Sequence, residues 1–161
     1  MAKQLLSGKF GPTSEGPDRL DRDFRPASLD LYDDIEEQFR RMAFNIIARN
    51  QGGHVKNIGF LMNKSGAWSL PPAFDMSYSY NSSGAWAKNH QMFMNGKRDL
   101  FDIGDFKACA KLASMKRGRA EEILDQAQRV VQKWSQFADQ AGVGAEFKDK
   151  VATAHRADIL T

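Results

Sequence analysis

The chain has 161 residues, a net charge of +3 and a single cysteine. A composition that is 42% hydrophobic and 27% charged suits one globular domain with one core, and the small charge does not argue for a nucleic-acid partner. The sequence contains no run of 18 apolar residues, so we expect no transmembrane helix. A lone cysteine cannot form an internal disulfide. We therefore expect a cytoplasmic protein from a reducing compartment.

Residues 1–27 combine glycines, prolines and mixed charges without a hydrophobic period. This composition is typical of a segment that cannot bury enough apolar surface to fold. We therefore expect an irregular, partly disordered leader over residues 1–27 and a folded domain over residues 28–161.

The first expected element is an amphipathic helix that begins at about residue 28 and stops near Asn50. Acidic residues at its start favour its positive N-terminal end. Its apolar side chains recur at helical spacing, at Ile35, Phe39, Met42, Ala43, Ile46 and Ile47. Because Gly52-Gly53 is a strong helix breaker, the helix should deliver the loop that ends at Asn57.

A loop, a strand, a turn, a second strand and a second loop follow. The apolar runs 58–62 and 67–70 flank a turn at residues 63–66, which predicts a hairpin. Asn57 and Asp75 lie just outside its two strands, so the hairpin should bring them together. Their oxygen atoms suit a Mg²⁺ ion that is held partly by phosphate and water. The alternative is plain turn chemistry, because Asn and Asp are common in loops.

The rest of the chain predicts a mainly helical fold with at most one more small hairpin. Residues 77–91 are rich in Ser, Tyr, Asn and Gly and indicate a long loop. Asn95-Gly96 is a favoured two-residue turn between residues 91–94 and 97–101. Helical patterns cover residues 105–115, 119–141 and 145–160, and the pair Trp134 and Phe137 should lie in the core.

Two motifs in this order resemble the catalytic core of the HipA-type toxin serine/threonine kinases. The first is His-x-Lys-Asn before a hydrophobic strand, and the second is Pro-Ala-Phe-Asp-x-Ser-Tyr after it. The similarity continues through His90-Gln91-Met92 and Asn95-Gly96-Lys97-Arg98 and spans roughly residues 35–141. The resemblance implies a helical, bundle-like kinase C-terminal lobe from a toxin–antitoxin module.

The resemblance also implies a site for ATP and magnesium. Asn57 and Asp75 would hold the metal. The nucleotide would lie against His54, Val55, Lys56, Asn57, Phe74 and Asp75. His54 has two readings: it holds its loop by a hydrogen bond, which we favour, or it acts as a general base.

The loop departs from the family pattern at the catalytic position. The family normally has Asp-[Asp/Gly]-His-x-Lys-Asn, whereas this chain has Gly52 and Gly53 before His54. A kinase needs a carboxylate to accept or orient the substrate hydroxyl proton, and glycine supplies none. Gln51 could orient a hydroxyl but cannot act as a base. We therefore expect a chain without phosphoryl-transfer activity as it stands, in effect a pseudokinase.

The sequence shows no glycine-rich phosphate loop and no strand-borne lysine of the kind a kinase N-terminal lobe carries. We therefore expect a truncated kinase, of which this chain is only the C-terminal part. The family's substrates are proteins, such as a tRNA-synthetase-like protein. An alternative is a non-catalytic module that docks on a separately encoded N-terminal lobe or on an antitoxin-like DNA-binding repressor. A helical scaffold without a nucleotide site is the third reading.

Other candidate sites are weaker. Five basic residues form a cluster that we interpret as a solvated face rather than a direct nucleic-acid contact, namely Lys107, Lys111, Lys116, Arg117 and Arg119. His90 and His155 have no partners at zinc-ligand spacing, and Cys109 should be buried in a helix.

Overall fold

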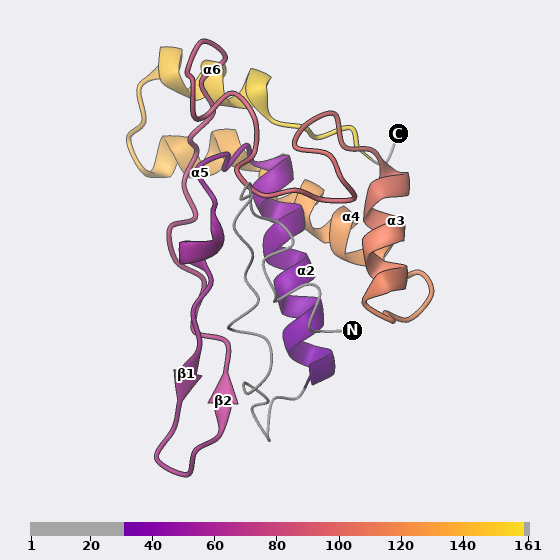
Figure 1. Cartoon of the computed structure of the whole chain (residues 1–161). Coiled ribbons are helices and arrows are strands. Elements are labelled where there is room, and N and C mark those ends of the chain that lie inside the picture. Colours follow the sequence, from indigo (N-terminus) through magenta and orange to yellow (C-terminus); the bar gives the residue numbers. More distant parts are fainter. Residues whose placement is uncertain (1–30, 160–161) are drawn as a thin grey trace.

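The computed structural model describes residues 31–159, and the leader predicted for residues 1–27 lies outside this range. The described chain is mainly helical, with one two-stranded antiparallel sheet (Figure 1). Its elements are α2 (Leu31–Ile47), a 3₁₀ turn η1 (Val55–Asn57), β1 (Leu61–Met62), β2 (Trp68–Ser69), α3 (Ile103–Leu112), α4 (Arg119–Val131), α5 (Trp134–Gln140) and α6 (Ala145–Ala154). Within residues 31–159, none of the helices combines the length and the apolar character that crossing a bilayer requires.

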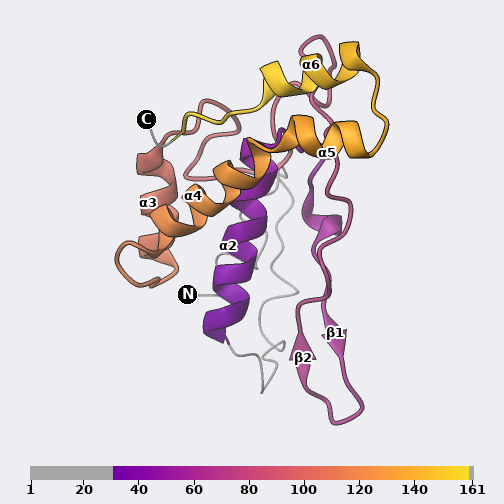
Figure 2. The same ribbon diagram turned by 180° about the vertical axis from the view of Figure 1, so that it is seen from behind.

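Helix α2 is the centre of the fold, and its apolar stripe forms the core with α3 and α4. Phe39, Ala43 and Ile47 are buried on this stripe, as the helical spacing predicts. The ring of Phe39 meets Phe106 of α3 edge to face at 6.2 Å. Figure 2 shows α4 crossing α2, with α3 beside it. The core is completed mainly by Met94, Phe101, Cys109, Ala110, Ala120, Ile123, Leu124, Ala127 and Val131.

Helix α2 ends before the glycine pair. Arg49 takes a left-handed conformation with φ of 58°, and the backbone N–H of Asn50 donates to the carbonyl of Asn45 at 2.8 Å. This geometry is a helix C-terminal cap without glycine. The guanidinium of Arg49 lies 4.3 Å from the ring centroid of Tyr80 and donates to the carbonyl of Ala154 at 2.8 Å. The contacts of Arg49 with Tyr80 and Ala154 therefore hold the C-terminal end of α2 in place.

The β1–β2 hairpin extends away from the helices in both views (Figures 1 and 2). It is antiparallel, with Leu61 opposite Ser69 and Met62 opposite Trp68, so the first predicted hairpin is confirmed with strands shorter than expected. Leu61 and Met62 are 53% and 59% exposed. Because no second layer from residues 31–159 covers these side chains, packing within this range does not extend the pairing along the predicted strands.

The second predicted hairpin is reduced to one bridge, between Met94 and Lys97. The turn itself forms, because Asn95 and Gly96 both have positive φ, at 50° and 77°. The side chains of Asn95 and Lys97 then donate to the buried carboxylate of Asp105 at the start of α3, each at 2.8 Å. The turn is therefore anchored to a helix rather than extended into two strands.

Asp105 belongs to a capping box at the N-terminus of α3. The carboxylate of Asp102 accepts from the N–H groups of Gly104 and Asp105, and Asp105 accepts in return from the N–H of Asp102 at 3.0 Å. Burial acts to raise the pKa of Asp105, but the hydrogen bonds from Lys97 and Asn95 outweigh it and lower the pKa. Asp105 is therefore ionised and fully engaged in holding α3.

The single helix predicted over residues 119–141 is wrong. Helix α4 ends at Val131 and α5 begins at Trp134. Between them the N–H of Lys133 donates to the carbonyl of Val130 at 3.1 Å, three residues earlier instead of the four of an α-helix. The turn lets α5 pack on α6, with the indole N–H of Trp134 donating to the carbonyl of Lys148 at 2.9 Å. Phe137 is 46% exposed as a result, so its expected place in the core is also wrong.

The segment after α6 returns to the C-terminal end of α2. The N–H of Arg156 donates to the carbonyl of Ile47 at 2.9 Å, and the buried side chain of Gln128 donates to the carbonyl of Ala157 at 2.8 Å. These bonds satisfy a terminal carbonyl of α2 and hold the last described residues against α4. The end of the chain therefore braces the point from which the candidate site loop departs.

Candidate functional site

The two side chains that the hairpin was predicted to join do meet. Asn57 is the last residue of η1, and Asp75 follows the proline pair after β2. The side-chain amide of Asn57 donates a hydrogen bond to the carboxylate of Asp75. The carboxylate remains on the exposed side of the loop. The two loop mouths therefore form one polar position that solvent reaches.

Asp75 is held in an unusual backbone conformation. Its φ is 55°, in the left-handed region that Asp and Asn tolerate better than most residues. The buried amide of Asn50 donates to the carbonyl of Asp75 at 2.9 Å and to the side-chain oxygen of Asn45 at 3.0 Å. Asn50 therefore fixes the loop that presents the carboxylate. Sequence reasoning missed this role, although an asparagine directly after the apolar stripe was a visible signal.

The glycine loop is fixed to the segment that follows Asp75. The N–H of Gly52 donates to the hydroxyl oxygen of Ser79 at 2.6 Å, and that hydroxyl donates to the side-chain oxygen of Asn50 at 3.3 Å. A Cβ atom at position 52 would lie 3.2 Å from the Ser79 Oγ atom, which is a tight contact with a side chain and not with backbone. The Cβ atom of an aspartate at position 52 can therefore be accommodated if the Ser79 hydroxyl moves by a few tenths of an ångström.

Gln51 does not face the site. It is fully buried, and its amide nitrogen, assigned from its surroundings, reaches the carbonyl oxygens of Ala87 and Lys88 at 2.7 and 3.1 Å. The expectation that Gln51 could orient a substrate hydroxyl is therefore wrong. Its amide is used to hold the long loop of residues 77–91 against the end of α2.

His54 caps the 3₁₀ turn. Its Nδ1 atom accepts from the N–H of Lys56 at 3.2 Å, which supports the loop-holding interpretation of this residue over general base. Val55 and Lys56 are exposed beside it. Phe74 is 45% exposed. Its ring lies close to Gly59, where an added Cβ atom would be 3.6 Å from the ring. The six predicted nucleotide-site residues thus lie on the two neighbouring loops.

The residues at this position fit a shared Mg²⁺ site and not a closed metal cage. Within residues 31–159, no three His, Cys, Asp or Glu side chains group closely enough to hold a metal. Asn57 and Asp75 are two ligand side chains, and the Asn57 amide must turn its oxygen toward the cation. Mg²⁺ bound to a nucleotide needs only one or two protein ligands, because phosphate and water supply the rest.

Features outside the hairpin have structural roles. Arg119 of the basic cluster pairs with Glu36 and Glu122, both at 2.8 Å, and Lys107 lies 3.3 Å from Glu121. These pairs agree with a solvated, salt-bridged face. Cys109 is buried, and burial raises the pKa of its thiol, which makes it a poor nucleophile.

A comparison with known families places the chain beside a described family. The family model described as HipA-like C-terminal domain matches residues 20–134, well over half of the chain. No curated protein and no solved structure matches the chain. The match includes both loops of the candidate site and helices α2 to α4. The chain therefore belongs to the family of HipA-like C-terminal domains.

Proposed function

We propose that this chain is the Mg²⁺- and nucleotide-binding half of a HipA-type serine/threonine kinase cleft, inactive in phosphoryl transfer as it stands. The observation that carries the proposal is the contact between Asn57 and Asp75 at the mouths of two loops. Two oxygen-bearing side chains that converge at an exposed position are what a nucleotide-bound Mg²⁺ ion requires from a protein.

Each residue of the site has a role in this proposal. Asn57 and Asp75 would hold Mg²⁺, which neutralises negative charge on the phosphates when it is bound. Lys56 is exposed one residue before Asn57 and would contact a phosphate as a point charge. Val55 and Phe74, 47% and 45% exposed, offer apolar surface beside the polar position for the rest of the nucleotide.

The same loop explains why transfer is not expected. Gly52 has no carboxylate, the Nδ1 atom of His54 already accepts a backbone hydrogen bond, and Gln51 is buried. A kinase needs a group that takes or orients the proton of the attacking hydroxyl. The loop from Gln51 to Asn57 presents no such group, so the proposal is binding without catalysis.

The test is a calorimetric titration of the full chain with ATP, with and without Mg²⁺. We expect weak binding that depends on Mg²⁺ and is lost in Asp75→Asn, which removes the charge while it keeps the size and the backbone tolerance of the residue. Asp149→Asn, at an exposed position on α6, is the matched control. Binding that is absent, or that is equal in Asp75→Asn and the wild type, contradicts the proposal.

A second candidate, a docking module, rests on the apolar surface around the site. Leu61 and Met62 of the projecting hairpin are more than half exposed, and Phe74 lies near its base. Large exposed apolar side chains on a projecting hairpin are available for contact with another protein. The partner in this candidate is a separately encoded N-terminal lobe or an antitoxin-like DNA-binding repressor.

Co-purification from the source cell tests the docking candidate. We expect mass spectrometry to identify a polypeptide with a glycine-rich phosphate loop and a strand-borne lysine, or a helix-turn-helix protein. Recovery should fall in Leu61→Ser, because its exposed side chain would lie in the interface. It should persist in Leu112→Ser, which changes a similarly exposed leucine, 51% against 53%, on α3. Equal loss in both variants would contradict a hairpin interface.

A further inference from the structure

The turn at Asn95 and Gly96 contains a chemically reactive pair that neither proposed role of the chain uses. The chain has seven asparagines, and Asn95 is the one that a glycine follows. Both residues of the pair are exposed, and a Cβ atom added to Gly96 would meet nothing within 4 Å. Within residues 31–159, no group accepts a hydrogen bond from the N–H of Gly96. The Gly96 nitrogen is therefore free to react.

An Asn-Gly pair can modify itself without an enzyme. The backbone nitrogen of the second residue attacks the side-chain carbonyl carbon of the asparagine, and a Cβ atom on the second residue hinders this approach. Glycine has no Cβ atom, whereas the residues that follow the other six asparagines all carry side chains. The attacking nitrogen must first lose its proton, so the reaction is faster at higher pH.

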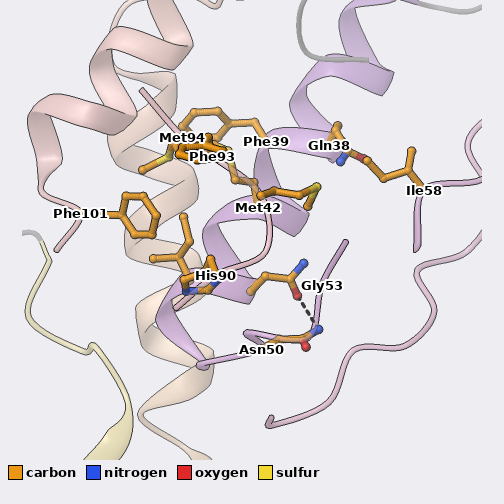
Figure 3. A pocket seen from close by; sticks show the side chains of 13 residues that line it. Gln38, Phe39, Met42, Asn50, Gly53, Ile58, His90, Phe93, Met94 and Phe101 are labelled. Atoms are coloured by element: carbon orange, nitrogen blue, oxygen red, sulfur yellow. Dashed lines mark hydrogen bonds between the residues drawn. The ribbon is translucent and has the colours of Figure 1, made fainter. Parts of the chain in front are cut away.

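The Asn95 side chain also anchors the turn. Its amide donates to the Oδ1 atom of Asp105 at 2.8 Å, and the Nζ atom of Lys97 donates to the Oδ2 atom at 2.8 Å. The side chain of Asp105 is only 3% exposed, so water does not readily replace a lost donor. On the other side of the turn, buried Met94 lies with Phe39 of α2 in the lining of an apolar pocket (Figure 3). The turn therefore joins α3 to α2.

We propose that Asn95 is a site of deamidation, and that the products detach the turn from the N-terminus of α3. The Gly96 nitrogen forms a bond to the Cγ atom of Asn95, the bond from Cγ to Nδ2 breaks, and the proton of the Gly96 nitrogen leaves with the amide as ammonia. A cyclic succinimide remains. Water then opens the ring at Cγ, which gives aspartate, or at the main-chain carbonyl, which gives isoaspartate. One water is consumed, and nothing is oxidised or reduced.

Both products remove a donor and add a charge. In the aspartate product an oxygen replaces the nitrogen that donates to Asp105, so a second carboxylate faces a buried one. Like charges at this separation repel, and water screens the repulsion poorly at a buried group. Lys97 is already shared between Asp102 and Asp105, so it does not neutralise the new charge. Isoaspartate also lengthens the main chain of the turn, which disturbs the bridge between Met94 and Lys97.

The inference does not rest on metal or nucleotide binding. The carboxylate of Asp75 is held through Asn50 and Asn57, whereas Asn95 holds the start of α3. Its failure and the failure of the proposed function are therefore separate results.

The first measurement follows the full chain during storage at neutral and at mildly alkaline pH, by digestion and mass spectrometry of the peptides. We expect Asn95 to change from amide to carboxyl before any other asparagine, at a rate that rises with pH. Asn81 and Asn89 are internal controls, because both are exposed but are followed by Ser82 and His90. Labelling by an enzyme that methylates isoaspartate identifies the succinimide route. Earlier deamidation elsewhere, or aspartate without isoaspartate at position 95, would overturn the proposal.

The second measurement tests the effect on α3 by hydrogen exchange. Asn95→Asp reproduces one product and keeps the tolerance for a φ of 50°. We expect the amides at the start of α3 to exchange about tenfold faster than in the wild type, as loss of a hydrogen bond to a buried charge implies. Asn89→Asp adds the same charge at an exposed position and should exchange like the wild type.

Stored wild-type protein gives the same comparison if Asn95→Asp does not fold, because modified and unmodified molecules are then present in one sample. The modified molecules should exchange faster at the start of α3. Equal exchange in the modified and unmodified molecules, or in Asn95→Asp and Asn89→Asp, would show that the turn stays attached to α3 and would overturn the proposal.

Discussion

The side-chain amide of Asn57 donates a hydrogen bond to the carboxylate of Asp75, which lies eighteen residues further along the chain. The hairpin between them returns the chain to its starting point, and Asn50 holds the second loop through the carbonyl of Asp75 at 2.9 Å. The position of the carboxylate therefore depends on three elements: the end of α2, the 3₁₀ turn and the hairpin.

The left-handed conformation of Asp75 leads to a prediction about stability. Asp75→Gly and Asp75→Ala both remove the hydrogen bond from Asn57, but only alanine places a Cβ atom at a φ of 55°. We expect the alanine variant to be less stable by about 1 kcal/mol, because non-glycine residues are strained in this region. Chemical denaturation of the two variants measures the difference, and equal midpoints would show that the loop relaxes.

Asn50 should matter for both stability and binding. Asn50→Ala removes three hydrogen bonds from a side chain that is 3% exposed, so we expect a loss of roughly 1–3 kcal/mol in the free energy of unfolding. The affinity for Mg²⁺–ATP should fall as well, because the Asp75 loop loses its support. Asn89→Ala, at an exposed position, is the control. Unchanged affinity in a folded Asn50→Ala protein would show that Asn50 does not position the site.

Restoring a carboxylate at position 52 should restore activity once a family N-terminal lobe is added. The Cβ atom of Gly52→Asp can be accommodated if the Ser79 hydroxyl moves, since the two atoms would lie 3.2 Å apart. We expect ATP turnover about 10²–10⁴-fold above that of the Gly52 form, the usual contribution of a positioned acid or base.

Gly52→Asn is the matched control for that reconstruction, because it has the same shape as aspartate without the charge. It should remain near the Gly52 level in the same turnover assay. If the Gly52 form turns over ATP as fast as the aspartate form, the inferred role of this position is wrong.

His90 predicts how stability changes with pH. Burial lowers its pKa in the folded protein to about 3, against about 6.5 in an unfolded chain. The unfolded chain therefore binds the proton more readily, so the stabilising contribution is complete above pH 6.5 and is lost as the pH falls toward 3. The slope from this group approaches about 1.4 kcal/mol per pH unit between those values.

Comparing the unfolding free energies of the wild type and His90→Phe at pH 7 and pH 4.5 checks this prediction. The wild type should lose more stability than His90→Phe over that range. His155→Phe should lie between the two, because burial lowers the pKa of His155 as well. Parallel losses in the wild type and His90→Phe would mean that His90 does not titrate abnormally.

Much of the fold follows from local patterns in the sequence. The stripe from Phe39 to Ile47 predicts α2 and its buried face, because a 3.6-residue period places those side chains on one side of a helix. The turn signals at residues 63–66 and at Asn95-Gly96 predict both chain reversals. The long helix over residues 119–141 failed, because a continuous apolar stripe does not reveal that α5 packs on α6 instead of on the core.

The sequence by itself determined the helical class, the chain reversals and the pairing of the Asn57 and Asp75 loops, because these depend on periodicity and turn chemistry between near neighbours. Only the tertiary structure decided that Gln51 points inward, that Asn50 holds Asp75 and that the Nε2 atom of His90 is buried without a hydrogen-bond partner among the described residues. These features depend on which groups, distant in the sequence, form hydrogen bonds with a buried polar side chain. The local sequence pattern does not predict those contacts.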